Sequence, residues 1–193
     1  MDQLNAHQFS NVYKALKIDL DDLGCVMLNV KRSDMPLMPE YENELSDKFY
    51  FSEDEDRFWI DGYVARSTPH LTLLYGLLES ASTYRYYIDD VLKGWKLETV
   101  EVESIGSFDS TYEEEKYCCI VAHIKVTPEV QEGHERLEFL PHVNTFTGFK
   151  PHVTLAYIKE DPEFKAQIIK EMSDVLVGKT LTITGVNYGE DEE

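Results

Sequence analysis

Positive charge is scarce in this chain of 193 residues, which has 18 lysines and arginines against 37 aspartates and glutamates. The formal net charge is −19. Proteins that bind long RNA or DNA usually present a basic surface, because they have to neutralise the phosphates that they contact. We therefore expect no long nucleic acid as a partner. A small nucleotide needs only a local positive site, so this charge does not exclude it.

Cysteine and long apolar runs are scarce as well. The three cysteines, Cys25, Cys118 and Cys119, form no C-x-x-C pair, which favours free thiols in a reducing cytoplasm. No apolar run is long enough to span a membrane, and the first residues lack the pattern of a signal peptide. We therefore expect a cytoplasmic protein with no membrane partner.

The sequence does contain a repeated heptapeptide. Residues 69–75 read Pro-His-Leu-Thr-Leu-Leu-Tyr, and residues 151–157 read Pro-His-Val-Thr-Leu-Ala-Tyr. Each copy is typical of a short strand, in which side chains two positions apart point to the same face. Each copy therefore presents an imidazole and a hydroxyl together, and two such imidazoles facing one cleft supply a base and an acid for one reaction. The two pairs are His70 with Thr72 and His152 with Thr154.

These motifs resemble those of the 2H phosphoesterase superfamily, which includes bacterial 2′-5′ RNA ligase-like proteins and cyclic phosphodiesterases. Residues 149–156, Phe-Lys-Pro-His-Val-Thr-Leu-Ala, are similar to the second motif of the family, and residues 69–73 are similar to the first. The resemblance implies two lobes related by a pseudo-twofold axis, with the motifs facing a central groove. It also implies that the two histidines and two threonines are the catalytic residues.

The chemistry implied by the resemblance is metal-independent cleavage of a phosphodiester. Histidine has an unperturbed pKa of about 6.5, so one imidazole can act as base while the other acts as acid near neutral pH. The threonine hydroxyls can donate to the phosphate oxygens as negative charge builds on them. Family substrates include 2′,3′-cyclic phosphates, 2′-5′-linked oligonucleotides and cyclic oligonucleotide signals, which some phage members destroy to disarm bacterial defence. We expect a small nucleotide substrate and no cofactor, with a viral counter-defence role as one option.

Three alternatives stay open. A non-catalytic protein that binds or sequesters nucleotides could keep this fold, although binding alone does not require both imidazoles. An RNA end-processing or ligating enzyme is a second alternative, against which the absence of a basic stripe counts. Metal-dependent catalysis is the third: His142 precedes the second motif histidine by ten residues, but no H-x-x-x-H or histidine–cysteine cluster accompanies it. We expect no metal.

Residues beside the motifs are weaker candidates for substrate binding. Nucleobases stack on aromatic rings at about 1–3 kcal/mol each, and lysine or arginine can meet a phosphate. A place in the core is the more ordinary interpretation of the aromatic candidates, and a surface charge is an equally ordinary interpretation of the basic ones. The substrate-binding candidates are Arg66, Lys150, Trp59, Tyr63 and Phe149, with Phe146 close by.

Several other residues are expected to be structural. Tyr75 and Tyr157 have the opposite strand parity to the motif histidines, so regular strands would point them into the core. His7, His123 and His134 have no motif around them, and we interpret them as structural histidines.

The spacing of apolar residues predicts one α+β domain over residues 1–193, with mostly antiparallel sheets and flanking helices. Besides the motifs, the expected strands cover 24–31, 58–64, 99–108, 117–126 and 180–188. The expected helices cover 80–95, 128–139 and 161–176, with Thr127 as an N-cap and Pro162 in a first turn. Residues 33–57 carry many acids and are expected to form a surface loop or insertion.

Overall fold

The protein is described by a computed structural model that covers residues 23–35, 69–109, 117–144, 146, 148–159 and 161–189. Six strands and three α-helices make up this part, which confirms the predicted α+β class. The strands are β1 (Gly24–Val30), β2 (His70–Leu77), β3 (Thr99–Asp109), β4 (Tyr117–Ile124), β5 (His152–Lys159) and β6 (Thr180–Asn187). The helices are the 3₁₀ helix η1 (Arg32–Asp34) and the α-helices α4 (Arg85–Val91), α5 (Pro128–Leu137) and α6 (Pro162–Leu176).

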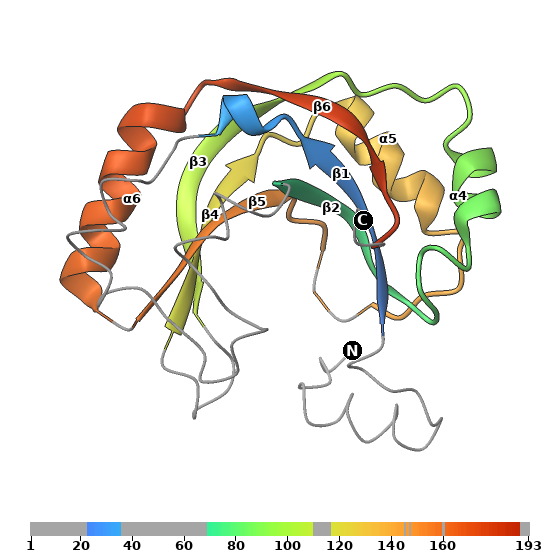
Figure 1. The fold of residues 1–193 in the computed structure, drawn as a ribbon, viewed down its shortest axis with the longest axis horizontal. Coiled ribbons are helices and arrows are strands. Elements are labelled where there is room, and N and C mark those ends of the chain that lie inside the picture. Colours follow the sequence, from blue (N-terminus) through green and yellow to red (C-terminus); the bar gives the residue numbers. More distant parts are fainter. Residues whose placement is uncertain are drawn as a thin grey trace, which may run out of the picture.

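All strand pairs are antiparallel, and the strands close a ring in the order β1-β2-β5-β4-β3-β6. The two motif strands, β2 and β5, are neighbours in this ring and pair through Leu71 and Val153. Figure 1 shows the strands as an arch, with α6 at one end and α4 and α5 at the other. The motifs therefore meet at the middle of the molecule, although they lie far apart in the sequence.

The two halves of the ring repeat one pairing pattern. β1 pairs with the first motif strand in the same register in which β4 pairs with the second. This repetition agrees with the predicted pseudo-twofold arrangement, and it extends the sequence repeat to the strand beside each motif. The matching pairs are Cys25–Tyr75 with Cys119–Tyr157, Met27–Thr72 with Val121–Thr154, and Asn29–His70 with His123–His152.

The core lies on the other face of the motif strands. Leu71 and Val153, which flank the motif threonines in sequence, are fully buried, and the same core includes Ile168 of α6. Helix α6 begins at the predicted place because Asp161 accepts hydrogen bonds from the first-turn amides, and Thr127 caps α5 in the same way. Each Å² of apolar surface removed from water stabilises the fold by about 25 cal/mol, and this burial holds the motif strands against the helices.

Some predicted boundaries are wrong. The helix expected over 80–95 is confined to α4, and turns occupy 81–84 and 92–94 on either side of it. The expected strand over 58–64 and nearly all of the acidic stretch 33–57 lie outside the described residues. The three cysteines are free, as predicted. Within the described ranges, no helix has both the length and the apolar character needed to cross a membrane.

Candidate active site

The four motif side chains share one face of β2 and β5. Leu71 and Val153 lie opposite each other and face the core, so the residues on either side of them point the other way. In an antiparallel register that passes through this pair, the histidine of each motif lies across from the threonine of the other. Residues placed in this way have Cβ atoms about 4.5–5.5 Å apart. Extending the register by one residue in each direction from Leu71 and Val153 gives the expected pairs His70 with Thr154 and Thr72 with His152.

Both motif strands carry a bulge immediately after the threonine. The pairing of β1 with β2 skips Leu73, and the pairing of β4 with β5 skips Leu155. A bulge adds one residue to a strand and moves the side chains that follow it to the other face. Tyr75 and Tyr157 therefore lie on the strand face of the motif histidines. The prediction of a core position is wrong for the exposed Tyr75, because it assumed a regular strand. Tyr157 is partly buried and packs against the core.

The two tyrosines make different contacts on this face. Tyr75 is 39% exposed, and its ring lies 5.8 Å from that of Phe146, which is 75% exposed. Tyr157 is partly buried and lies opposite Cys119. The Sγ atom of Cys119 also lies 3.7 Å from Oγ1 of Thr154. One tyrosine side chain from each half thus lies on the strand face of the motif residues.

His152 is held by a backbone hydrogen bond. Its Nδ1 lies 2.8 Å from the carbonyl oxygen of Lys150, and because a carbonyl can only accept, Nδ1 carries the proton. The other ring nitrogen, Nε2, is then the atom that can take up or release a proton. The carbonyl of Lys150 thus orients the imidazole of His152. The side chain of Lys150 is exposed and carries a positive charge beside the motif.

A third histidine lies beside the second motif. His123 of β4 lies directly opposite His152, although the sequence indicated only a structural role. Burial lowers the pKa of His123 below its usual value, and the neighbouring charges of His152 and Lys150 lower it further, whereas Glu103 acts in the opposite direction. The ring of Phe108 contacts both imidazoles, edge to face, with centroids 5.5 Å from His123 and 4.9 Å from His152. One signal in the sequence could have found His123. A cysteine precedes Asn29 by four residues, and a cysteine precedes His123 by four residues, so the two segments take equivalent positions in the two halves.

Burial disfavours the two thiols on this face, Cys25 and Cys119, as nucleophiles. Burial raises the pKa of the Cys25 thiol. Burial also raises the pKa of the Cys119 thiol, although hydrogen bonds with Thr154 and Tyr157 act in the opposite direction. A thiol with a raised pKa is largely protonated near neutral pH and is a poor nucleophile.

The weaker substrate-binding candidates are only partly brought together. Phe149 packs against the core and stacks on His134, with ring centroids 4.1 Å apart and planes 2° from parallel. His134 is structural, as predicted: its Nδ1 lies 2.7 Å from the carbonyl oxygen of the bulged residue Leu73. Arg66, Trp59 and Tyr63 lie outside the described residues.

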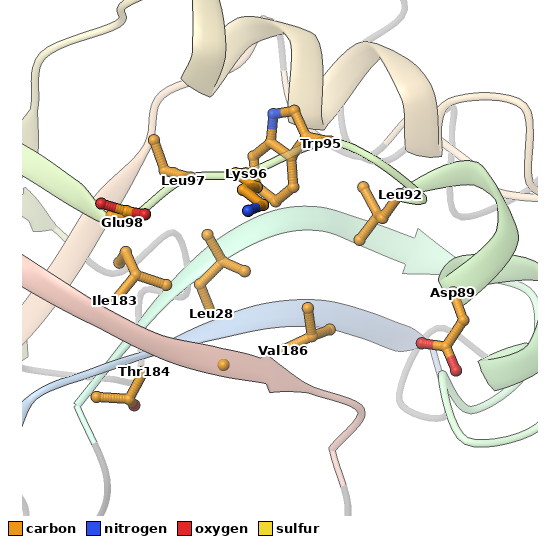
Figure 2. Close-up of a pocket in the computed structure, with 11 residues that line it drawn as sticks. Leu28, Asp89, Leu92, Trp95, Lys96, Leu97, Glu98, Ile183, Thr184 and Val186 are labelled. Atoms are coloured by element: carbon orange, nitrogen blue, oxygen red, sulfur yellow. The ribbon is translucent and has the colours of Figure 1, made fainter.

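One pocket of the described chain lies away from the motifs. It has a volume of about 470 Å³ and is lined by β6 and by the segment that follows α4, as Figure 2 shows. Leu28 contributes to it from β1, and this residue belongs to the core face rather than the motif face. The pocket therefore contains none of the motif residues.

A scan against protein-family models matches residues 48–191 to the 2′-5′ RNA ligase superfamily. No curated protein matches the chain. The matched range covers most of the chain and includes both H-x-T motifs, which the structure brings together on one face. The chain therefore belongs to the 2′-5′ RNA ligase superfamily of 2H phosphoesterases, as the two motifs predict, and this superfamily comprises phosphodiesterases and ligases.

Proposed function

We propose that this protein is a metal-independent phosphodiesterase that cleaves small nucleotide phosphodiesters with His70 and His152 as its acid–base pair. The observation that best supports the proposal is the pairing of β2 with β5 through Leu71 and Val153, which brings the two H-x-T motifs side by side. A phosphate bound between the motifs would meet one imidazole and one hydroxyl from each half. This arrangement suits in-line attack, in which the entering and leaving oxygens lie on opposite sides of phosphorus.

The proposed reaction needs two proton transfers. A neutral histidine accepts the proton of the attacking oxygen, from water or from a substrate hydroxyl, while that oxygen bonds to phosphorus. The protonated histidine gives its proton to the oxygen whose bond to phosphorus breaks. On His152 the proton moves at Nε2, because Nδ1 is engaged with the carbonyl of Lys150. Thr72 and Thr154 donate to the non-bridging oxygens as charge builds there.

The charge of the chain supports a small substrate. With a net charge of −19, the protein repels a long polyanion at every phosphate outside the site. A nucleotide with few phosphates needs only local cations, and exposed Lys150 beside His152 is one. We therefore favour cyclic oligonucleotide signals, 2′-5′-linked oligonucleotides and 2′,3′-cyclic phosphates. A preference for the first of these would also support a viral counter-defence role.

The test is a comparison of kcat/KM on four substrates: a cyclic dinucleotide, a 2′-5′ oligoadenylate, a nucleoside 2′,3′-cyclic phosphate and a long single-stranded RNA. We expect cleavage of at least one small substrate and little cleavage of the RNA at low salt. The screening length is about 8 Å at physiological salt, so added salt should help the RNA more than a small ligand. The H70A/H152A double variant is the control for contaminating nucleases. Efficient cleavage of RNA at low salt would overturn the small-substrate proposal, and cleavage of none of the four would favour the nucleotide-binding alternative.

A further inference from the structure

The two halves of the site differ beside the motif histidines. Asn29 lies opposite His70, and His123 takes the equivalent place opposite His152. The amide of Asn29 accepts a hydrogen bond of 3.0 Å from Nδ2 of Asn187 on β6. In the other half, Gly106 of β3 occupies the place of Asn187. Asn187 pairs with Met27, two residues before Asn29, and Gly106 pairs with Val121, two residues before His123. One half therefore carries an amide pair where the other carries an imidazole over a glycine.

Because Gly106 has no side chain, the His123 ring can pack against the backbone at this position. A Cβ atom at this position would lie 2.7 Å from Nε2 and 3.1 Å from Cδ2 of His123. Both distances are shorter than ordinary van der Waals contact, so the ring lies directly against the backbone of β3. His123 is thus packed in a defined position beside His152.

Phe108 adds an aromatic ring beside both imidazoles of this half. It follows Gly106 by two residues on the same strand, so its side chain lies on the same face. Its ring meets His123 at 83° and His152 at 76°, and it is only partly buried. The residue two positions after Asn187 is Gly189, so the half that contains His70 has no aromatic ring at the corresponding position.

The chemistry of this surface suits a flat, neutral ligand group. Burial lowers the pKa of His123, which favours the neutral form of its imidazole. A neutral imidazole can donate at one nitrogen and accept at the other, and nucleobases carry both donors and acceptors on their edges. Aromatic side chains next to a nucleic-acid backbone site commonly bind bases by stacking.

We propose that Phe108 and His123 form a nucleobase-binding subsite next to His152, and that Asn29 and Asn187, which take the equivalent places in the other half, do not form its counterpart. The inference rests on the proposed function, because it takes the phosphate to lie between the two motifs. The base attached on the His152 side is then bound by stacking and hydrogen bonding. The site thereby distinguishes the two ends of its substrate, although the motifs themselves are nearly identical.

The test compares adenosine 2′,3′-cyclic phosphate with the 2′,3′-cyclic phosphate of 1-O-methylribose, which lacks a base. The readout is the ratio of kcat/KM for the nucleoside to kcat/KM for the baseless substrate. In the F108L and H123N variants we expect this ratio to fall about tenfold, within the range measured for loss of a base–aromatic stack. H123N also copies the residue of the other half. The matched control is F139L, because Phe139 is 89% exposed beyond α5 and should leave the ratio unchanged.

Two outcomes separate the subsite from the proposed function. If kcat/KM for both substrates falls equally in F108L and H123N, these residues act only on the position of His152, and the subsite is wrong. If the wild-type protein cleaves neither substrate, the proposed function fails for this class, and binding of adenosine 5′-monophosphate followed by NMR decides the subsite. Weaker binding by F108L than by F139L would support it, whereas equal binding would overturn it.

Discussion

Replacing Gly106 with alanine should move the His123 ring while leaving the fold intact. The added Cβ would lie 2.7 Å from Nε2 of His123, so the ring has to retreat by about 0.7 Å to reach the ordinary contact distance of 3.4 Å. Alanine at a compatible backbone position stabilises a protein by about 0.4–1 kcal/mol. A side chain forced off its preferred rotamer costs about 0.5–1.5 kcal/mol. These two effects offset each other, so the free energy of unfolding should change by less than about 1 kcal/mol, and Tm by no more than about 2–4 °C.

The pKa of His123 is the more sensitive readout of this change. Burial is the main reason why this pKa is low, so displacing the ring toward water should raise it toward its usual value. NMR titration of the histidine rings in the wild-type protein and in G106A measures the shift directly. G185A is the matched control, because Gly185 lies opposite Asn29 in the other half and an added Cβ there meets nothing within 4 Å. An unchanged pKa in G106A, or an equal rise in G185A, would refute the packing of His123 on Gly106.

Four further predictions concern catalysis and stability. H70A and H152A should each lower kcat by about 10²–10⁴-fold on a cleaved substrate, and near wild-type turnover in either variant would rule out the two-histidine mechanism. Activity should survive EDTA and give a bell-shaped pH–rate profile, whereas loss on chelation that a divalent ion restores would favour metal-dependent catalysis. Because the pKa of His123 is lower in the folded than in the unfolded chain, the folded state binds fewer protons and its stability falls as the pH drops below about 6.5. The free energy of unfolding, measured with urea at about pH 7.5 and about pH 5.5, should fall less in H123N than in the wild-type protein. An equal fall in both proteins would contradict this assignment. G133A should destabilise the protein by about 1–3 kcal/mol despite the helix preference of alanine, because its Cβ would lie 2.4 Å from the Trp95 ring; a rise in Tm would contradict this.

The motif pair could be predicted from the sequence because its chemistry is local. The i, i+2 spacing of histidine and threonine places both side chains on one face of any regular strand, whatever that strand pairs with. The caps at Thr127 and Asp161 are local as well, since each side chain bonds to amides two or three residues further along the chain. Net charge depends only on composition. The α+β class, the family and these helix starts therefore followed from the sequence.

The tertiary structure decided which other residues join the motifs. Whether a tyrosine five residues after a histidine shares its face depends on the bulges at Leu73 and Leu155, and a bulge exists only relative to the partner strand. His123 lies beside His152 because β4 and β5 pair in one register, a long-range contact that no local pattern specifies. Asn29 takes the equivalent place beside His70 for the same reason. The sequence by itself thus determined the repeated chemistry of the site, and strand pairing alone decided the difference between its two halves.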